Sequence, residues 1–312
     1  MPPTANRRWT RRHFLRALGA SVLAGGTGTP SVAAPAGEPL RRAIPATGER
    51  IPVIGMGTWI TFNVGQDTAL RAARTEVLRT FIEMGGGMVD SSPMYGSAEE
   101  VIGHALRQTG TPEKLFSATK VWTGRGGQGA PQMAASRDLW GLDRLDLVQV
   151  HNLLAWREHL STIRAERDRG LVRYIGVTTS HGRRHDELEG ILRSEPIDFV
   201  QLTYNILDRE AERRLLPLAA DRGVAVIANR PFRQKALITR FERHPLPEWA
   251  TEIACSNWPQ FLLKFIVSNP AVTCAIPATS RVDHMRENMG ALHGPLPDAA
   301  MRARMVDYVQ AL

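Results

Sequence analysis

The sequence is poor in cysteine, and the two that it has, Cys255 and Cys274, are not arranged to bind a metal. They form no Cys-x-x-Cys pair and no mixed Cys/His spacing, which excludes the usual zinc sites and a disulfide-rich scaffold, so no metal is expected. An exported protein can still join two cysteines in a disulfide. A cysteine on a helix and another in a central strand, as predicted here, are more often free thiols, and both alternatives stay open.

Acidic residues are absent before Gly37, although this segment carries five arginines. The formal net charge of the whole chain is +8, and removing these five charges leaves +3. The remaining charge forms no basic stripe, so the high pI does not indicate a nucleic-acid-binding protein. The five residues are Arg7, Arg8, Arg11, Arg12 and Arg16.

The mildly apolar stretch near the start, residues 17–28, is too short and too rich in glycine to be a permanent membrane span. Paired arginines precede it in Thr10-Arg-Arg-His-Phe-Leu-Arg16, and small residues after it allow cleavage after Ala33 or Ala36. This arrangement resembles a twin-arginine export signal, which is read by an export machinery that carries folded cargo. We therefore predict a cleaved signal over residues 1–36 and a periplasmic protein over residues 37–312. The alternative is a disordered basic tail on a cytoplasmic protein.

The rest of the chain has the composition of a globular enzyme, with 43% hydrophobic and 22% charged residues, no short internal repeat and no low-complexity tract. Helical and strand patterns alternate along it, with Asp67 and Ser97 as expected helix caps. Eight such units predict a closed α/β barrel, a (β/α)8 TIM barrel, in one domain. A hairpin over residues 40–53 precedes the barrel, and residues 233–259 form the longest irregular connection. The eight expected strands are residues 53–57, 88–90, 115–121, 145–151, 171–178, 198–202, 224–228 and 272–276.

Ionisable residues end three successive strands of this pattern. Asp90 closes the second, Lys120 lies near the end of the third, and His151 closes the fourth, while Tyr95 lies on the loop after Asp90. The carboxyl ends of barrel strands are where such folds place their chemistry. A lysine ammonium beside a tyrosine is expected to lower the tyrosine pKa, a carboxylate keeps the ammonium charged, and a histidine orients a carbonyl oxygen. These residues therefore suit general acid catalysis on a carbonyl group.

In order and spacing, these four residues resemble the catalytic Asp, Tyr, Lys and His of the aldo-keto reductase family. The resemblance runs from about Arg42 to the C-terminus and includes several short fragments. It implies a (β/α)8 barrel whose N-terminal hairpin closes the bottom, and an oxidoreductase that uses NADPH, less often NADH, to interconvert carbonyls and alcohols. The fragments are Gly55-Met-Gly-Thr-Trp59, Tyr95-Gly-Ser-Ala-Glu-Glu100, Gly176-Val-Thr178, Gln201-Leu-Thr-Tyr-Asn205 and Ile276-Pro-Ala-Thr-Ser280.

The resemblance also implies a cofactor site. The nicotinamide amide would be held after strands five and six, and the other end of the cofactor would lie on a helix start after strand eight. Asn229 occupies the position of an aromatic ring on strand seven, which leaves Arg230 or Phe232 to contribute there, with Arg230 facing the pyrophosphate. Ala278 and His284 replace two residues that hold the 2′-phosphate in many members, so a preference for NADP rests on Arg281; a simple helix cap is the alternative for that segment. The expected cofactor residues are Thr58, Thr178, Thr179, Gln201, Asn229, Arg230, Pro231, Phe232, Thr279, Ser280, Arg281, Glu287 and Asn288.

Aromatic residues beyond strands one and three point to the substrate. Trp59 and Trp122, with Asn152, are expected to contact a small-molecule carbonyl compound, and aromatic walls favour an apolar or aromatic one; burial of Trp122 under a loop is the alternative. Two other functions stay open: a nicotinamide-nucleotide-binding regulatory or accessory protein with little turnover, and a barrel aldolase that uses Lys120 as a Schiff base.

Overall fold

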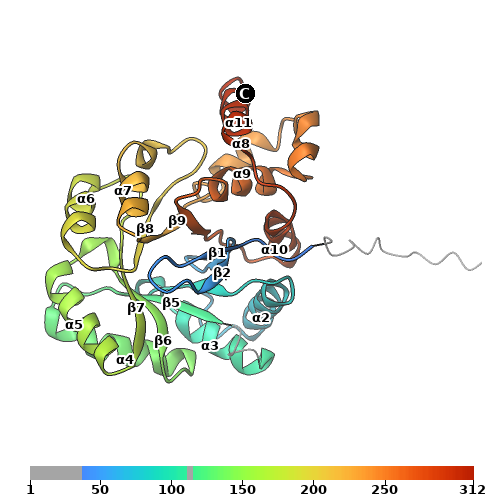
Figure 1. Ribbon diagram of the computed structural model, residues 1–312. Helices are drawn as coiled ribbons and strands as arrows, with labels where there is room; N and C mark the ends of the chain where they lie inside the picture. Colours follow the sequence, from blue (N-terminus) through green and yellow to red (C-terminus); the bar gives the residue numbers. More distant parts are fainter. Residues whose placement is uncertain (1–36, 111–114) are drawn as a thin grey trace, which may run out of the picture. The chain divides into compact units, whose positions relative to one another are not determined.

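The structure is a computed structural model that describes residues 37–110 and 115–312. Eight parallel strands form one sheet in the order β10-β9-β8-β7-β6-β5-β4-β3. Parallel bridges from Ile54 to Ala275 and from Gly57 to Ala278 join the two outer strands, so the sheet closes into a barrel (Figure 1). The strands are β3 (Met56–Gly57), β4 (Met88–Asp90), β5 (Phe116–Val121), β6 (Leu145–Val150), β7 (Val172–Thr178), β8 (Phe199–Thr203), β9 (Ala225–Asn229) and β10 (Val272–Ala275).

Helices connect the strands and lie outside the barrel, which confirms the predicted (β/α)8 fold (Figure 1). Asp67 caps the first of them as predicted, because its Oδ1 accepts a hydrogen bond from Leu70 N at 2.9 Å. The predicted signal over residues 1–36 lies outside the described residues. The helices are α2 (Thr68–Glu83), α3 (Ala98–Thr109), α4 (Gly129–Trp140), α5 (Trp156–Asp168), α6 (His185–Ser194), α7 (Leu215–Asp221), α8 (Ala236–Phe241), α9 (Trp258–Val267), α10 (Val282–Met289) and α11 (Ala299–Gln310).

Alternate residues of each strand point into the barrel and against the helices. Met88, Leu147 and Phe199 belong to a buried cluster inside the barrel, whereas their neighbours Val89 and Val148 belong to the larger core shared with the helices. Polar residues follow at the next inward positions, so the carboxyl end of the barrel interior is polar. These inward polar residues are Asp90, Lys120, Gln149, Gln201 and Asn229.

The N-terminal hairpin of β1 (Arg41–Ala43) and β2 (Arg50–Pro52) covers the amino-terminal end of the barrel, as predicted. Ile44 and Ile51 belong to the same buried cluster as the inward residues of the strands. At the hairpin turn, Thr47 Oγ1 lies 2.8 Å from the hydroxyl of Tyr174, a residue near the start of β7. The hairpin therefore closes the bottom and leaves the opposite end open for chemistry.

Several local predictions were wrong. The side chain of Ser97 does not cap α3; its hydroxyl donates to Asn63 Oδ1 at 3.1 Å and accepts from Gly65 N at 2.7 Å, because the loop after β3 packs against it. His151 does not end a strand but begins a 3-10 helix, His151–Leu153. The connection over residues 233–259 is not irregular throughout, since it contains α8 and the 3-10 helix Glu248–Ile253.

The remaining observations concern the start of β3, the two cysteines and metal binding. β3 is shorter than predicted because the residues before it bond elsewhere than to β4: Gly55 N donates to Ala275 O, while Val53 accepts from Ala275 N and donates to Leu40 O. Cys255 and Cys274 are both free and buried. Within residues 37–110 and 115–312, no group of three His, Cys, Asp or Glu side chains is placed to hold a metal ion.

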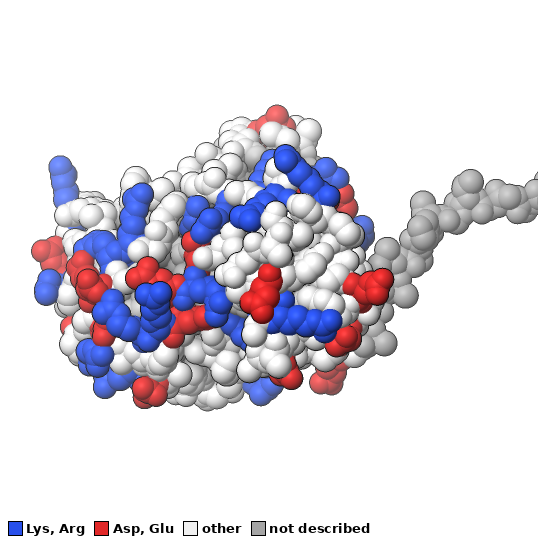
Figure 2. All heavy atoms as spheres, turned by 90° about the horizontal axis from the view of Figure 1, so that it is seen from above, with Lys and Arg blue, Asp and Glu red and all other residues white. Residues whose placement is uncertain are grey.

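Charges of both signs intermingle on the face shown in Figure 2. Ion pairs are numerous among the described residues: Arg214, for example, pairs with Asp186 and with Glu189, both at 2.7 Å. Of the helices in the described part of the chain, none is both long enough and apolar enough to cross a bilayer.

Candidate active site

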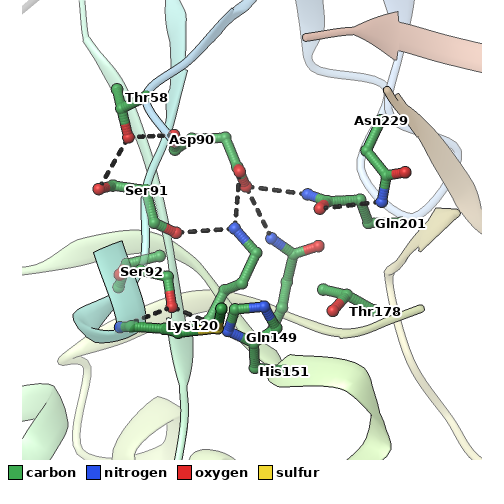
Figure 3. A network of polar contacts seen from close by, with 12 residues as sticks. Thr58, Asp90, Ser91, Ser92, Lys120, Gln149, His151, Thr178, Gln201 and Asn229 are labelled. Carbon is green, nitrogen blue, oxygen red and sulfur yellow. Dashed lines mark hydrogen bonds and ion pairs between the residues drawn. The ribbon is translucent and has the colours of Figure 1, made fainter. Parts of the chain in front are cut away.

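A buried ion pair lies at the carboxyl end of the barrel interior. Lys120 Nζ of β5 lies 2.6 Å from Asp90 Oδ2 of the neighbouring strand β4, and it also donates to Ser91 O at 2.7 Å (Figure 3). The two side chains are only 1% and 3% exposed. Removing two charges from water is costly unless they are paired and hydrogen-bonded, and here the ion pair and the hydrogen bond to Ser91 O offset that cost.

Tyr95 reaches this pair from the loop after β4. It ends a short 3-10 helix, Pro93–Tyr95, which the Ser92 side chain caps by accepting from Met94 N at 3.2 Å. Lys120 Nζ lies 5.0 Å from the centre of the Tyr95 ring, and the ring of His151 lies 5.8 Å away in a T-shaped contact. The structure therefore brings together the four residues that the sequence predicted as catalytic.

The pKa of Tyr95 differs from the sequence-based expectation. Burial raises it above its ordinary value, and the charge of Lys120 lowers it only in part. The presence of the lysine was predicted, but the extent of tyrosine burial was not visible in the sequence. The pKa of Lys120 is raised, because attraction to Asp90 and Tyr95 outweighs the effect of burial. At neutral pH the site thus holds a phenol beside an ammonium.

His151 is neutral in this site. Burial, aided by the charge of Lys120, lowers its pKa to about 3. Its Nδ1 lies 2.9 Å from Ser92 Oγ, which already accepts a hydrogen bond from Met94 N. When the serine hydroxyl donates to Nδ1, the ring proton resides on Nε2, and this is the tautomer that the mechanism below uses. A neutral imidazole of this form can donate a hydrogen bond to a carbonyl oxygen.

Two glutamines complete the surroundings of Asp90. Gln149 Nε2 and Gln201 Nε2 donate to Asp90 Oδ1 at 3.2 Å and 2.9 Å, so Oδ2 is left to Lys120 (Figure 3). Gln201 was predicted to bind the cofactor, and Gln149 was not predicted to belong to the site. The signal for Gln149 was available, because it lies two residues before His151 on a strand whose alternate residues point inward.

The predicted cofactor residues after β7 lie beside this network. Thr178 Oγ1 accepts from Asn152 N at 3.0 Å. Thr179 Oγ1 and Gln149 Oε1 are buried and find no hydrogen-bond partner among the described residues. A buried hydroxyl and a buried amide oxygen without partners suit a ligand that carries a carboxamide. These residues therefore fit the nicotinamide end of a dinucleotide.

Asn229 stands where the resemblance places a stacking ring, and its side chain is a hydrogen-bonding group instead. Its amide donates to Thr179 O at 2.8 Å and to Gln201 Oε1 at 3.4 Å, while its Oδ1 accepts from Thr203 Oγ1 at 2.7 Å. Phe232 does not compensate, because its ring is buried in the main core. The end of β9 therefore carries an amide that bonds to neighbouring strands, and it offers no aromatic ring on which a nicotinamide could stack.

Arg230 remains a candidate for the cofactor phosphates. Its backbone is left-handed, with φ of 53°, and its Nη1 is buried without a partner among the described residues. Pro231 beside it is buried. Thr58 is also buried, but its hydroxyl is already engaged, since it donates to Asp90 O at 2.9 Å and contacts Ser91 Oγ. Thr58 thus supports the catalytic strand rather than the cofactor.

The segment after β10 holds the other predicted cofactor residues. Thr279 Oγ1 accepts from Arg281 N at 3.2 Å, and α10 begins immediately afterwards. Ser280 O accepts a hydrogen bond from Arg74, while Asn288 is buried and Glu287 partly exposed on α10. The Arg281 guanidinium is exposed and forms a bidentate pair with Asp283. This carboxylate competes with a cofactor phosphate for Arg281, which the sequence-based prediction did not include.

Apolar side chains surround the open end of the barrel. Trp122 is 45% exposed, which excludes the alternative that it packs under a loop, and Trp59 is partly buried. Asn152 is exposed in a left-handed conformation on the loop after β6. Three exposed residues on neighbouring loops had no sequence signal, because loop exposure depends on the closed fold. They are Ile60, Met94 and Leu154.

The chain matches known proteins over most of its length. The Aldo/keto reductase family model matches residues 53–305. Methylglyoxal reductase YeaE of Escherichia coli (strain K12) is 29% identical over 262 residues, which cover 80% of this chain and 89% of that protein. Among solved structures, the thermostable aldo-keto reductase Tm1743 in complex with the inhibitor epalrestat is 32% identical, with a TM-score of 0.72 and coverage of 86% of this chain and 99% of that one.

A second solved structure, an aldo/keto reductase from Klebsiella pneumoniae in complex with NADP and acetate, has the same fold at 24% identity. Its TM-score is 0.72, and the match covers 84% of this chain and 92% of that one. The family model spans more than half of the chain, and the barrel with its converging Asp, Tyr, Lys and His agrees with it. The chain belongs to the aldo/keto reductase family and is an oxidoreductase that interconverts carbonyls and alcohols.

Proposed function

We propose that the protein reduces a small carbonyl compound with NADPH and that Tyr95 is the general acid. The observation that carries this proposal is the convergence of Tyr95, His151 and the buried Lys120–Asp90 pair at the open end of the barrel. When bound, the nicotinamide supplies a hydride to the carbonyl carbon. The residues of the chain hold the carbonyl oxygen and deliver a proton to it.

Each residue has a role that its contacts support. His151 donates from Nε2 to the carbonyl oxygen and orients it. Tyr95, protonated because its pKa is raised, gives its proton to the same oxygen as negative charge develops there. Lys120 stabilises the phenolate that forms, and Asp90 keeps the ammonium in place. A Schiff-base role for Lys120 is disfavoured, since such a lysine needs a lowered pKa and this one is raised.

Replacement of Tyr95 by phenylalanine tests the central step. Tyr95→Phe should lower kcat for carbonyl reduction by about 10²–10⁴-fold, the usual contribution of a general acid. NADPH binding, followed by tryptophan fluorescence, should change little because Tyr95 faces His151 and Lys120. A variant that retains activity within about threefold of wild type would show that another group is the acid.

We expect the substrate to carry an uncharged apolar group. Four apolar residues are exposed on the loops after the adjacent strands β3 to β6, and the proposed catalytic residues lie in or directly after three of these strands, β4 to β6. The four are Ile60, Met94, Trp122 and Leu154. The Trp122 backbone is clamped by Gln132, which accepts from its N–H at 2.6 Å and donates to its carbonyl at 3.1 Å. Exposed apolar side chains around a catalytic centre are typical of a binding surface.

A homologous series of aldehydes measures this preference. Each buried CH₂ contributes about 0.8 kcal/mol, so kcat/KM should rise about fourfold per added methylene until the exposed apolar side chains on these loops are covered. Trp122→Ala should flatten the rise without lowering kcat for the smallest aldehyde. A series in which kcat/KM does not grow with chain length would contradict an apolar substrate.

We also propose that the protein is exported through its N-terminal segment. The support lies in Arg11 and Arg12 before a mildly apolar stretch and in the small residues up to Ala36. The family match begins at residue 53, after this segment. A protein exported after folding would acquire its nucleotide in the cytoplasm, so the proposal implies that cofactor and barrel travel together.

Cell fractionation tests export. Arg11→Lys together with Arg12→Lys preserves the charge but removes the arginine pair, and should retain the protein in the cytoplasm. A wild-type protein whose mature N-terminus is still Met1, or whose delivery is unaffected by the double substitution, would refute export. Activity of the retained protein serves as the control for folding.

A further inference from the structure

The Asp90 carboxylate accepts three hydrogen bonds from the described residues, one on Oδ2 and two on Oδ1. Oδ2 receives Lys120 at 2.6 Å, while Oδ1 receives Gln201 at 2.9 Å and Gln149 at 3.2 Å (Figure 3). We propose that Gln149 is a positioning residue for carbonyl reduction: together with Gln201 it holds the carboxylate so that Oδ2 faces Lys120. The inference rests on the proposed role of Lys120 beside Tyr95.

The barrel is built to receive this glutamine. Gln149 is fully buried and lies in register between Lys120 on β5 and Gly176 on β7. A Cβ at residue 176 would come within 3.0 Å of Gln149 Cγ and 2.9 Å of Phe199 O, so a side chain there would displace it. The absence of a side chain at residue 176 therefore leaves the space that Gln149 occupies.

Packing alone does not explain an amide at this position. The preceding inward residue of the same strand, Leu147, is apolar and fully buried. Gln149 Oε1 has no hydrogen-bond partner among the described residues, and a buried unpartnered oxygen destabilises the fold. Within this part of the chain, the Gln149 Nε2 group bonds to Asp90, while Oε1 faces the region assigned above to a carboxamide; a leucine would lose both groups, so the test below separates them.

The second glutamine is held differently. Gln201 is fixed at both ends, by Asp90 and by Asn229, whose own oxygen accepts from Thr203. It thus links the catalytic carboxylate to the strand ends of β8 and β9. Among residues 37–110 and 115–312, the Gln149 side chain bonds only to Asp90, so its effect on catalysis should depend on the charge of Asp90.

A double-mutant cycle between Gln149→Leu and Asp90→Asn measures this dependence. An asparagine that turns its oxygen to Lys120 presents its NH₂ group to the glutamines, so it cannot accept from Gln149. In single-turnover reduction with bound NADPH, Gln149→Leu should slow the wild-type enzyme about tenfold, the effect of one hydrogen bond to a charged group. In the Asp90→Asn background the same substitution should slow it less than about twofold.

Gln260→Leu is the matched control. Gln260 is a buried glutamine on α9 whose oxygen accepts from Ser256, so its loss should lower stability without changing the single-turnover rate. If Gln149→Leu impairs folding, the unbranched Gln149→Met replaces it in the cycle.

Three outcomes decide the inference. A tenfold loss that disappears in the Asp90→Asn background, with the NADPH Kd unchanged, supports it. An equal loss in both backgrounds would show that Gln149 only supports the fold, and a loss confined to the NADPH Kd would place it on the cofactor. Absence of turnover in the wild type would instead contradict the proposed function, and the inference with it.

Discussion

His151 makes the stability of this protein depend on pH in a defined direction. Its native pKa is about 3, whereas the unfolded chain has an ordinary histidine of pKa about 6.5. Below that value the unfolded chain binds a proton that the native state does not bind, so stability falls as the pH falls toward 3. Each pH unit corresponds to about 1.4 kcal/mol, which gives about 2 kcal/mol between pH 6.5 and 5 and about 5 kcal/mol over the whole window.

Chemical unfolding of the wild type and of His151→Gln, at about pH 7 and about pH 5, isolates this effect from that of other titrating groups. The wild type should lose about 2 kcal/mol more than the variant over this interval. Glutamine does not titrate and can still receive the Ser92 hydrogen bond. Equal losses in the two proteins would show that His151 is protonated in the native state, and the assignment of a neutral imidazole would then be wrong.

Three further predictions concern other residues of the site. Lys120→Met should destabilise the fold by about 3–5 kcal/mol in thermal or chemical unfolding, because the Asp90 carboxylate is then buried without a counter-charge, and Lys120→Met with Asp90→Leu should recover part of that loss. Arg281→Ala should weaken NADPH binding about tenfold and NADH binding little, whereas Asp283→Ala should strengthen NADPH binding, both measured by fluorescence titration. Gly96→Ala should lower both Tm and kcat, because Gly96 has φ of +63° and an added Cβ would lie 2.3 Å from a side-chain oxygen.

The fold was predictable because its signals are local. Each strand reads as a short apolar run before a helical pattern, and Asp67 marks a helix start in the sequence. The strand ends were less predictable, as Val53 and His151 show: whether a residue extends a strand depends on a neighbouring strand that is distant in sequence. Ser97 has the residue type of a cap but bonds to Asn63, which a sequence pattern does not reveal.

The sequence reveals the proposed catalytic residues through their chemical type, and Gln149 was missed because its type gives no such signal. Asp90, Lys120 and His151 carry charges or titrate, and such residues stand out at strand ends. A glutamine in a strand does not, and only the closed barrel shows that it points at Asp90. Asn229 was identified as a departure from the family, but the three hydrogen bonds of its side chain depend on strands that meet only in three dimensions.

The pKa of Tyr95 decides in which direction the site works at neutral pH. To reduce a carbonyl, Tyr95 must begin as a phenol, and to oxidise an alcohol it must begin as a phenolate. The lysine alone would favour the phenolate, but burial favours the phenol and outweighs it. The raised pKa therefore keeps Tyr95 protonated at neutral pH, in the form that reduction requires. Lys120 acts after proton transfer, when it stabilises the phenolate that a lone buried tyrosine could not sustain.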